Sequence, residues 1–258
     1  YEIASCLVGS EMCIRDRVTQ SDLEQLCDMV TGYSRYAVSE TLSKGYLIGR
    51  GGFRVGVCGT AVLRDGANTN LRDISSVAVR ISRQVRGLAE PLLRELWEPE
   101  GFPSTLLLAP PGVGKTTLLR DMICALSDGD EQRPACRVGI VDERGELAAM
   151  YRGVPQLEVG AHTDVLDGCP KALGITMLLR SANPQVIAVD EITAEEDLRA
   201  MLSAAHCGVA LLATIHAANR EELARKPLFA RLLEMRVFQR IVTITVENGR
   251  RVYRVEAL

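Results

Sequence analysis

Residues 106–119 read LLLAPPGVGKTTLL, in which an apolar run, a turn rich in proline and glycine, and a second apolar segment follow one another. The first run is typical of a buried strand, and the segment after the turn has the spacing of a helix. Backbone N–H groups in such a turn and at the start of a helix can point together at a phosphate group. The stretch therefore predicts a phosphate-binding loop. Its expected contact residues are Pro110, Pro111, Gly112, Val113, Gly114, Lys115, Thr116 and Thr117.

Single side chains in this loop have distinct expected roles. Gly112 and Gly114 let the backbone approach phosphate closely. Lys115 can reach the β- and γ-phosphates of ATP, and the Thr116 hydroxyl can bind Mg²⁺. Ala109 stands where the pattern G-x-x-x-x-G-K-T has its first glycine, at the end of the strand, where alanine fits if its φ is negative. We therefore expect a working site for ATP and Mg²⁺.

Further apolar runs follow the loop, and helical segments separate them. Continuous apolar strands that alternate with helices indicate a parallel sheet covered on both faces. Asn248-Gly249, between two alternating segments, is a strong signal for a β-hairpin at the C-terminus. The expected fold is thus an α/β P-loop core with a parallel sheet. The four expected core strands are residues 105–109, 137–142, 185–190 and 209–216.

The pattern before the loop is different and predicts a separate small domain. Residues 18–97 combine helical segments with alternating strands between glycines, which indicates an α+β N-terminal domain. Residues 98–104 hold two prolines and a glycine and are expected to be a linker, followed by an ATPase domain over 105–258. Residues 1–17 lack clear periodicity, so we expect either a disordered extension or a segment foreign to the protein.

Composition argues against several classes of protein. The net charge is −3, and there are only one Trp and four Phe, so neither a global basic field nor a series of stacking aromatics favours nucleic acid as a partner. The eight cysteines contain no C-x-x-C pair, and we expect reduced thiols in a cytoplasmic protein. The longest apolar runs are too short to span a bilayer.

Acidic residues follow two of the expected strands. Asp190 and Glu191 end the third run, where Asp190 can hold the water shell of Mg²⁺ and Glu191 can polarise an attacking water. Asp142, Glu143 and Glu146 follow the second run, and each could face the γ-phosphate. Spacing alone favours Glu191 as the general base, because it follows the expected metal acid directly.

Thr214 and His216 end the fourth run. In open α/β sheets, ligands bind at the carboxyl ends of the strands. A polar pair at this place can sense the γ-phosphate of a bound nucleotide.

Several segments together closely resemble the stage III sporulation protein AA family, over roughly residues 18–258. They include APPGVGKTTLLRDM, VGIVDERGELAAMYRGVPQLEVGAHTDVLDGCPKA, LRSANPQVIAVDEI and HCGVALLATIHA. That family looks like a branch of the secretion and pilus ATPases, which have a RecA-like core. The resemblance implies ATP hydrolysis by a homo-oligomer, as a hexameric ring with nucleotide between subunits. It also implies membrane-protein partners at a channel between mother cell and forespore, with the chain in the cytoplasm and peripheral at the membrane that faces the forespore.

The resemblance also assigns roles to residues. VDERGEL is similar to the acidic box of secretion ATPases, which makes Glu146 the water-activating base and leaves Glu191 to support the metal and its waters. ATIHAAN is similar to their His box through His216. With Lys115, these are the expected catalytic residues, and the choice of base lies between Glu146 and Glu191.

A ring would let arginines of one subunit act on the nucleotide of the next, where they stabilise developing phosphoryl charge. The alternative for each arginine is a solvated basic surface. Two other functions also stay open, a nucleic-acid-dependent RecA-like ATPase and a nucleotide-binding scaffold with little turnover. The candidate arginines are Arg72, Arg80, Arg83 and Arg86.

Overall fold

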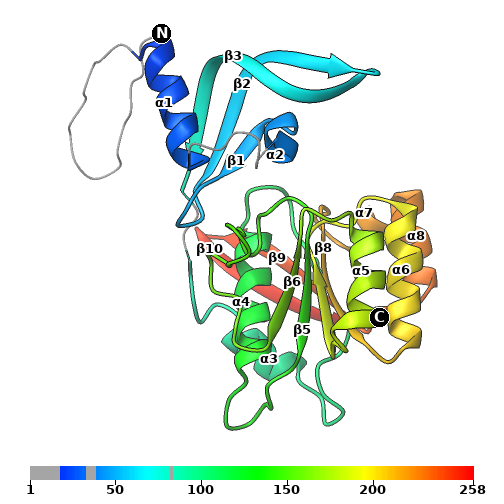
Figure 1. The fold of residues 1–258 in the computed structure, drawn as a ribbon. Helices are drawn as coiled ribbons and strands as arrows, with labels where there is room; N and C mark the ends of the chain where they lie inside the picture. The colour runs from blue at the N-terminus through cyan, green and yellow to red at the C-terminus, as the bar shows by residue number, and fades with distance from the viewer. Residues whose placement is uncertain (1–17, 33–38, 82–83) are drawn as a thin grey trace. The chain divides into compact units, whose positions relative to one another are not determined.

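The computed structural model describes residues 18–32, 39–81 and 84–258, and these form two compact units (Figure 1). The first unit takes the described residues before position 82 together with Tyr151–Gln156, and the second takes the rest of the chain. Residues 1–17, for which the sequence predicts no regular structure, lie outside the described residues, as does Arg83.

The first unit is an antiparallel meander with two helices. The strands are hydrogen-bonded in the order β1-β2-β3, and the apolar faces of β1 and β2 pack with α1 and α2 around a small core that includes Leu47, Val55 and Val57. The alternating segments between glycines therefore form the strands of an α+β unit. Its elements are α1 Gln20–Val30, α2 Ser39–Ser43, β1 Tyr46–Ile48, β2 Arg54–Arg64 and β3 Ala67–Arg80.

The second unit contains a seven-stranded sheet in the order β10-β9-β4-β8-β7-β5-β6. All neighbouring strands are parallel except the C-terminal pair β9 and β10, which form the predicted hairpin around Asn248-Gly249. The strands are β4 Thr105–Leu108, β5 Val138–Asp142, β6 Thr163–Asp167, β7 Val186–Val189, β8 Ala210–Ile215, β9 Arg240–Glu247 and β10 Arg250–Ala257. All four predicted core strands are present, so the predicted α/β fold class is confirmed.

Successive residues of these strands face opposite sides of the sheet, and both sides are buried. In β4, Leu107 belongs to the apolar cluster formed with α3 and α4, whereas Leu106 and Leu108 belong to the cluster formed with α5 and α6. Helices therefore cover both faces, as a parallel sheet requires. The helices are α3 Glu90–Leu96, α4 Lys115–Asp128, α5 Lys171–Ser181, α6 Glu195–His206, α7 Arg220–Arg225 and α8 Pro227–Glu234. Within the described ranges, no helix is long and apolar enough to cross a membrane.

The division into units differs from the predicted boundaries in two places. Leu92, Leu93 and Leu96 of α3 are buried in the same cluster as the sheet, so this helix and the expected linker 98–104 lie in the second unit. In the other direction, the segment Tyr151–Gln156 lies with the first unit, where the Gln156 side chain accepts a hydrogen bond from a backbone N–H of the glycine-rich turn before β2 (2.7 Å).

Candidate nucleotide-binding site

The loop between β4 and α4 has the backbone that a phosphate site requires. Gly112 and Gly114 have φ of +79° and +101°, which side chains disfavour, and Gly114 caps the N-terminus of α4. Ala109 is fully buried, and its φ is not positive, so alanine fits at this position without backbone strain. The loop therefore places the first turn of α4 at the carboxyl edge of the sheet.

Lys115 is the first residue of α4 and is only 5% exposed. Its ammonium group donates to the carbonyl oxygen of Ala109 (2.9 Å) and lies 2.5 Å from Nδ1 of His216. Burial lowers the pKa of Lys115, while the nearby carboxylates of Asp190 and Glu191 act to raise it. A phosphate group would supply the anionic partner that this buried ammonium otherwise finds only in part.

Thr116 and Asp190 meet directly. The Thr116 hydroxyl donates to one carboxylate oxygen of Asp190 (2.8 Å), and the Thr214 hydroxyl donates to the other (2.5 Å). Mg²⁺ prefers oxygen ligands and keeps several waters, with one or two protein groups and the phosphates completing its shell. The hydroxyl of Thr116 and the carboxylate of Asp190 fit this ion.

Glu191 follows Asp190 with a φ of +52°, an unusual backbone for a residue other than glycine. Its N–H donates to the Thr214 hydroxyl (2.8 Å), which holds this backbone in place. The Glu191 carboxylate forms an ion pair with Arg144 (2.7 Å) and lies 3.4 Å from Nε2 of His216. Glu191 therefore connects the ends of β7 and β8 with the turn after β5.

The turn after β5 is organised by Asp142, which is 2% exposed. Its carboxylate accepts hydrogen bonds from the backbone N–H groups of Glu146 (2.8 Å), Leu147 (3.0 Å) and Ala148 (2.8 Å). Burial raises the pKa of Asp142, and these three hydrogen bonds act in the opposite direction. The sequence had allowed Asp142 to face the γ-phosphate. In the structure its carboxylate instead anchors the turn.

The same turn brings Glu146 to the acids of β7. A small pocket is lined by residues of the two strand ends, including Glu146, Asp190 and Glu191. Because β5 and β7 are neighbours in the sheet, the two residues that compete for the role of general base face one space. Position in the structure therefore does not decide between Glu146, which the family resemblance favours, and Glu191, which the spacing favours.

Two buried cations at this site were not found from the sequence. Lys171, at the start of α5 and 4% exposed, forms an ion pair with Glu143. Arg120 of α4 donates to the carbonyl oxygens of Leu147 (2.8 Å) and Glu146 (2.5 Å), and burial lowers its pKa. The sequence shows only basic residues within helical segments, which does not reveal their burial or their partners.

The candidate arginines fall in both units. Arg72 and Arg80 are on β3 of the first unit, and the exposed Arg72 forms an ion pair with its neighbour Asp73 (3.5 Å). Arg86 belongs to the second unit and pairs with Glu158 (2.9 Å) and with Asp128 of α4 (3.2 Å). Their action on a neighbouring subunit stays a prediction.

The fold is that of the RecA-like secretion and pilus ATPases. The chain is similar to the ATPase DotB of Legionella pneumophila, with a TM-score of 0.60 and 17% identity over 96% of this chain and 71% of that one. It is also similar to the pilus retraction motor PilT, solved with bound ADP, with a TM-score of 0.52 and 18% identity over 80% of this chain and 59% of that one.

The sequence comparisons identify the family. Residues 8–255 match the family described as "Sporulation stage III, protein AA". The chain is 42% identical over 231 residues to stage III sporulation protein AA of Bacillus subtilis (strain 168), which covers 90% of this chain and 75% of that protein. The chain belongs to the sporulation stage III protein AA family, as its sequence motifs predicted.

Proposed function

We propose that this protein is an ATP-hydrolysing motor of the secretion-ATPase type, which powers a sporulation-associated membrane channel between mother cell and forespore. The observation that carries the proposal is the meeting of Lys115 and Thr116 with Asp190 and His216 at the carboxyl ends of neighbouring strands. Membership of the sporulation family supports the biological setting. The likeness to secretion and pilus ATPases supports the same fold only.

In this proposal each residue at the sheet edge has a role toward ATP. Lys115 binds the β- and γ-phosphates and stabilises the charge that develops during transfer. Thr116 and Asp190 would hold Mg²⁺, which when bound neutralises phosphate charge and orients the γ-phosphate. Glu146 takes a proton from the attacking water. Glu191 orients His216 and supports the metal waters.

A hexameric ring with nucleotide between subunits completes the proposal, with membrane proteins of the channel as partners and no nucleic acid. Arginines at the neighbouring subunit would then contact the transferred phosphoryl group. Measuring the mass of the protein in solution, with and without ATP and Mg²⁺, tests this part. We expect an assembly larger than a monomer, and a monomer at every concentration that supports turnover would contradict a shared site.

The hydrolysis itself is tested by phosphate release from the full chain with ATP and Mg²⁺. Lys115→Ala should abolish turnover, because a charge-assisted contact contributes roughly 1.5–3 kcal/mol to binding and more in the transition state. Lys44→Ala changes an exposed lysine of the first unit and serves as the control. Near-normal turnover in Lys115→Ala would refute the ATPase proposal. Tight ATP binding by the wild type with negligible turnover would favour a scaffold, and stimulation by DNA would favour a nucleic-acid-dependent enzyme.

A further inference from the structure

The C-terminal hairpin contacts the phosphate loop. Arg251 of β10 donates from Nε to the carbonyl oxygen of Val113 (2.7 Å). Its guanidinium group also lies close over Gly114, where an added Cβ would be 2.9 Å from a guanidinium nitrogen. Since the N–H groups of a phosphate loop point toward the anion, Arg251 supports the loop from the outside, through a carbonyl group.

Beside this contact lies a hollow of about 610 Å³. One wall is the hairpin, with Arg251 and Tyr253, and a second wall is formed by Leu88 and Pro91. The phosphate loop closes the hollow with Gly112 and Val113. The sequence alone did not reveal that these segments meet. The volume falls within the roughly 300–1,000 Å³ that is usual for small-molecule sites.

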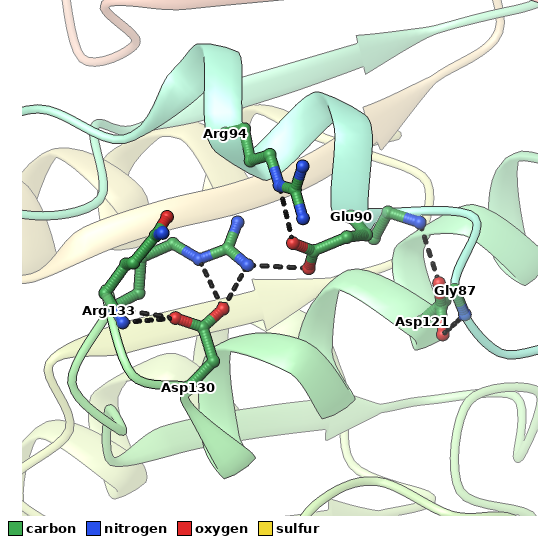
Figure 2. A network of polar contacts seen from close by, with 8 residues as sticks. Gly87, Glu90, Arg94, Asp121, Asp130 and Arg133 are labelled. Carbon is green, nitrogen blue, oxygen red and sulfur yellow. Dashed lines mark hydrogen bonds and ion pairs between the residues drawn. The ribbon is translucent and has the colours of Figure 1, made fainter.

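The wall before α3 is fixed to the helix that starts at the phosphate loop. Asp121 of α4, 2% exposed, accepts hydrogen bonds from the backbone N–H groups of Gly87 (3.2 Å) and Ala89 (2.7 Å). Figure 2 shows Asp121 directed at this segment, and beside it Glu90 bridging Arg94 and the buried Arg133. The wall is therefore held in place before any ligand binds.

We propose that this hollow binds the nucleoside of the nucleotide whose phosphates the loop contacts, with the Tyr253 ring as the surface for the base. The inference rests on the proposed function and adds a second part to the same site. Tyr253 is partly buried against the core cluster, and Leu88 and Pro91 present apolar surface opposite the hairpin. A flat base gains from stacking on an aromatic ring and from the face of the Arg251 guanidinium.

The test compares ATP with inorganic tripolyphosphate, which has the phosphates and lacks the nucleoside. Binding of each to the full chain with Mg²⁺ is measured by calorimetry. Tyr253→Ala should weaken ATP binding by at least about fivefold, as loss of base stacking does elsewhere, and leave tripolyphosphate binding unchanged. Tyr253→Phe should retain ATP affinity. Arg254→Ala, on the same strand but in an exposed ion pair with Glu247 (2.8 Å), should change neither.

Several results would overturn the inference and leave the proposed function standing. Equal affinity of the wild type for ATP and tripolyphosphate would mean that the nucleoside makes no useful contact, and this comparison needs no variant. Unchanged ATP affinity in Tyr253→Ala, or an equal loss for both ligands, would mean that the ring supports the fold or the loop and not the base. A wild-type protein that binds neither ligand would refute the proposed function itself.

Discussion

Asp142→Asn is expected to destabilise the second unit and to impair turnover without touching ATP. The carboxylate is 2% exposed and accepts three backbone hydrogen bonds from the turn that carries Glu146. Asparagine keeps one acceptor oxygen and turns its amide, a donor, toward at least one N–H group. A hydrogen bond to a charged group contributes roughly 1.5–3 kcal/mol, so the loss of one or two should cost about 2–4 kcal/mol.

Thermal unfolding measures this change directly. For a unit of this size, roughly 2–4 °C of midpoint is lost per kcal/mol, so a drop of about 5 °C or more is expected. Asp164→Asn, at an exposed position on the neighbouring strand β6, is the matched control and should unfold with the wild type. Phosphate release and ATP affinity are then measured below the unfolding range. If Asp142→Asn melts with the control, the carboxylate does not anchor the turn. If it melts early but turns over normally, the turn does not position Glu146.

Two further predictions concern the base and the network of Figure 2. Glu146→Gln should bind ATP normally and lose about 10²–10⁴-fold in the rate of hydrolysis, and high Mg²⁺ should not restore that rate. Glu191→Gln should hydrolyse ATP slowly and require a different Mg²⁺ concentration. If phosphate-release assays give the reverse pattern, the two roles must be exchanged. Hydrogen bonds from Arg133 lower the pKa of Asp130 to about 2, below its ordinary value of 3.8. The stability that the ionised Asp130 carboxylate contributes is therefore present above about pH 4 and is lost as the pH falls toward 2. The unfolding midpoint of Asp130→Asn should therefore depend less on pH in that range than the midpoint of the wild type. If the midpoints of both proteins fall equally between pH 4 and pH 2, Asp130 does not make this contribution.

The strands that were predictable share one physical property. Leu106 and Leu107 are both fully buried because the sheet is covered on both faces, and such strands produce continuous apolar runs. Strand β6, Thr163–Asp167, was not predicted, since it lies at the sheet edge and its residues are only partly buried or exposed, so it forms no continuous apolar run. The segment expected as a linker, residues 98–104, lies within the second unit for a related reason. Its prolines and glycine do break regular structure, but Phe102 is buried and Glu98 pairs with Gly101, so the segment packs with the core.

The residues of the site that could be predicted are likewise those whose place follows from the order of elements along the chain. The phosphate loop and the acids Asp190 and Glu191 directly follow strands, so their common edge could be inferred from the order of elements. The anchoring role of Asp142 depends on backbone groups several residues further along the chain, and the partner of Lys171 lies on another element. The sequence does not reveal these hydrogen bonds and ion pairs, because Asp142 and Lys171 are residue types that are also common in solvated turns.

The contacts of Lys115 explain why the two candidate bases are hard to separate by position alone. Lys115 donates to Nδ1 of His216, which leaves the ring proton on Nε2, facing Glu191, and Glu191 in turn pairs with Arg144 in the turn that carries Glu146. The ammonium cannot keep this contact and also contact the β- and γ-phosphates fully, since its donors are limited and the helix fixes its origin. Binding of ATP should therefore release His216 and shift the charge balance around Glu191. A glutamate held by an arginine and a histidine is suited to sense that change, whereas Glu146, set by its own backbone hydrogen bond to Asp142, keeps its place while it occurs.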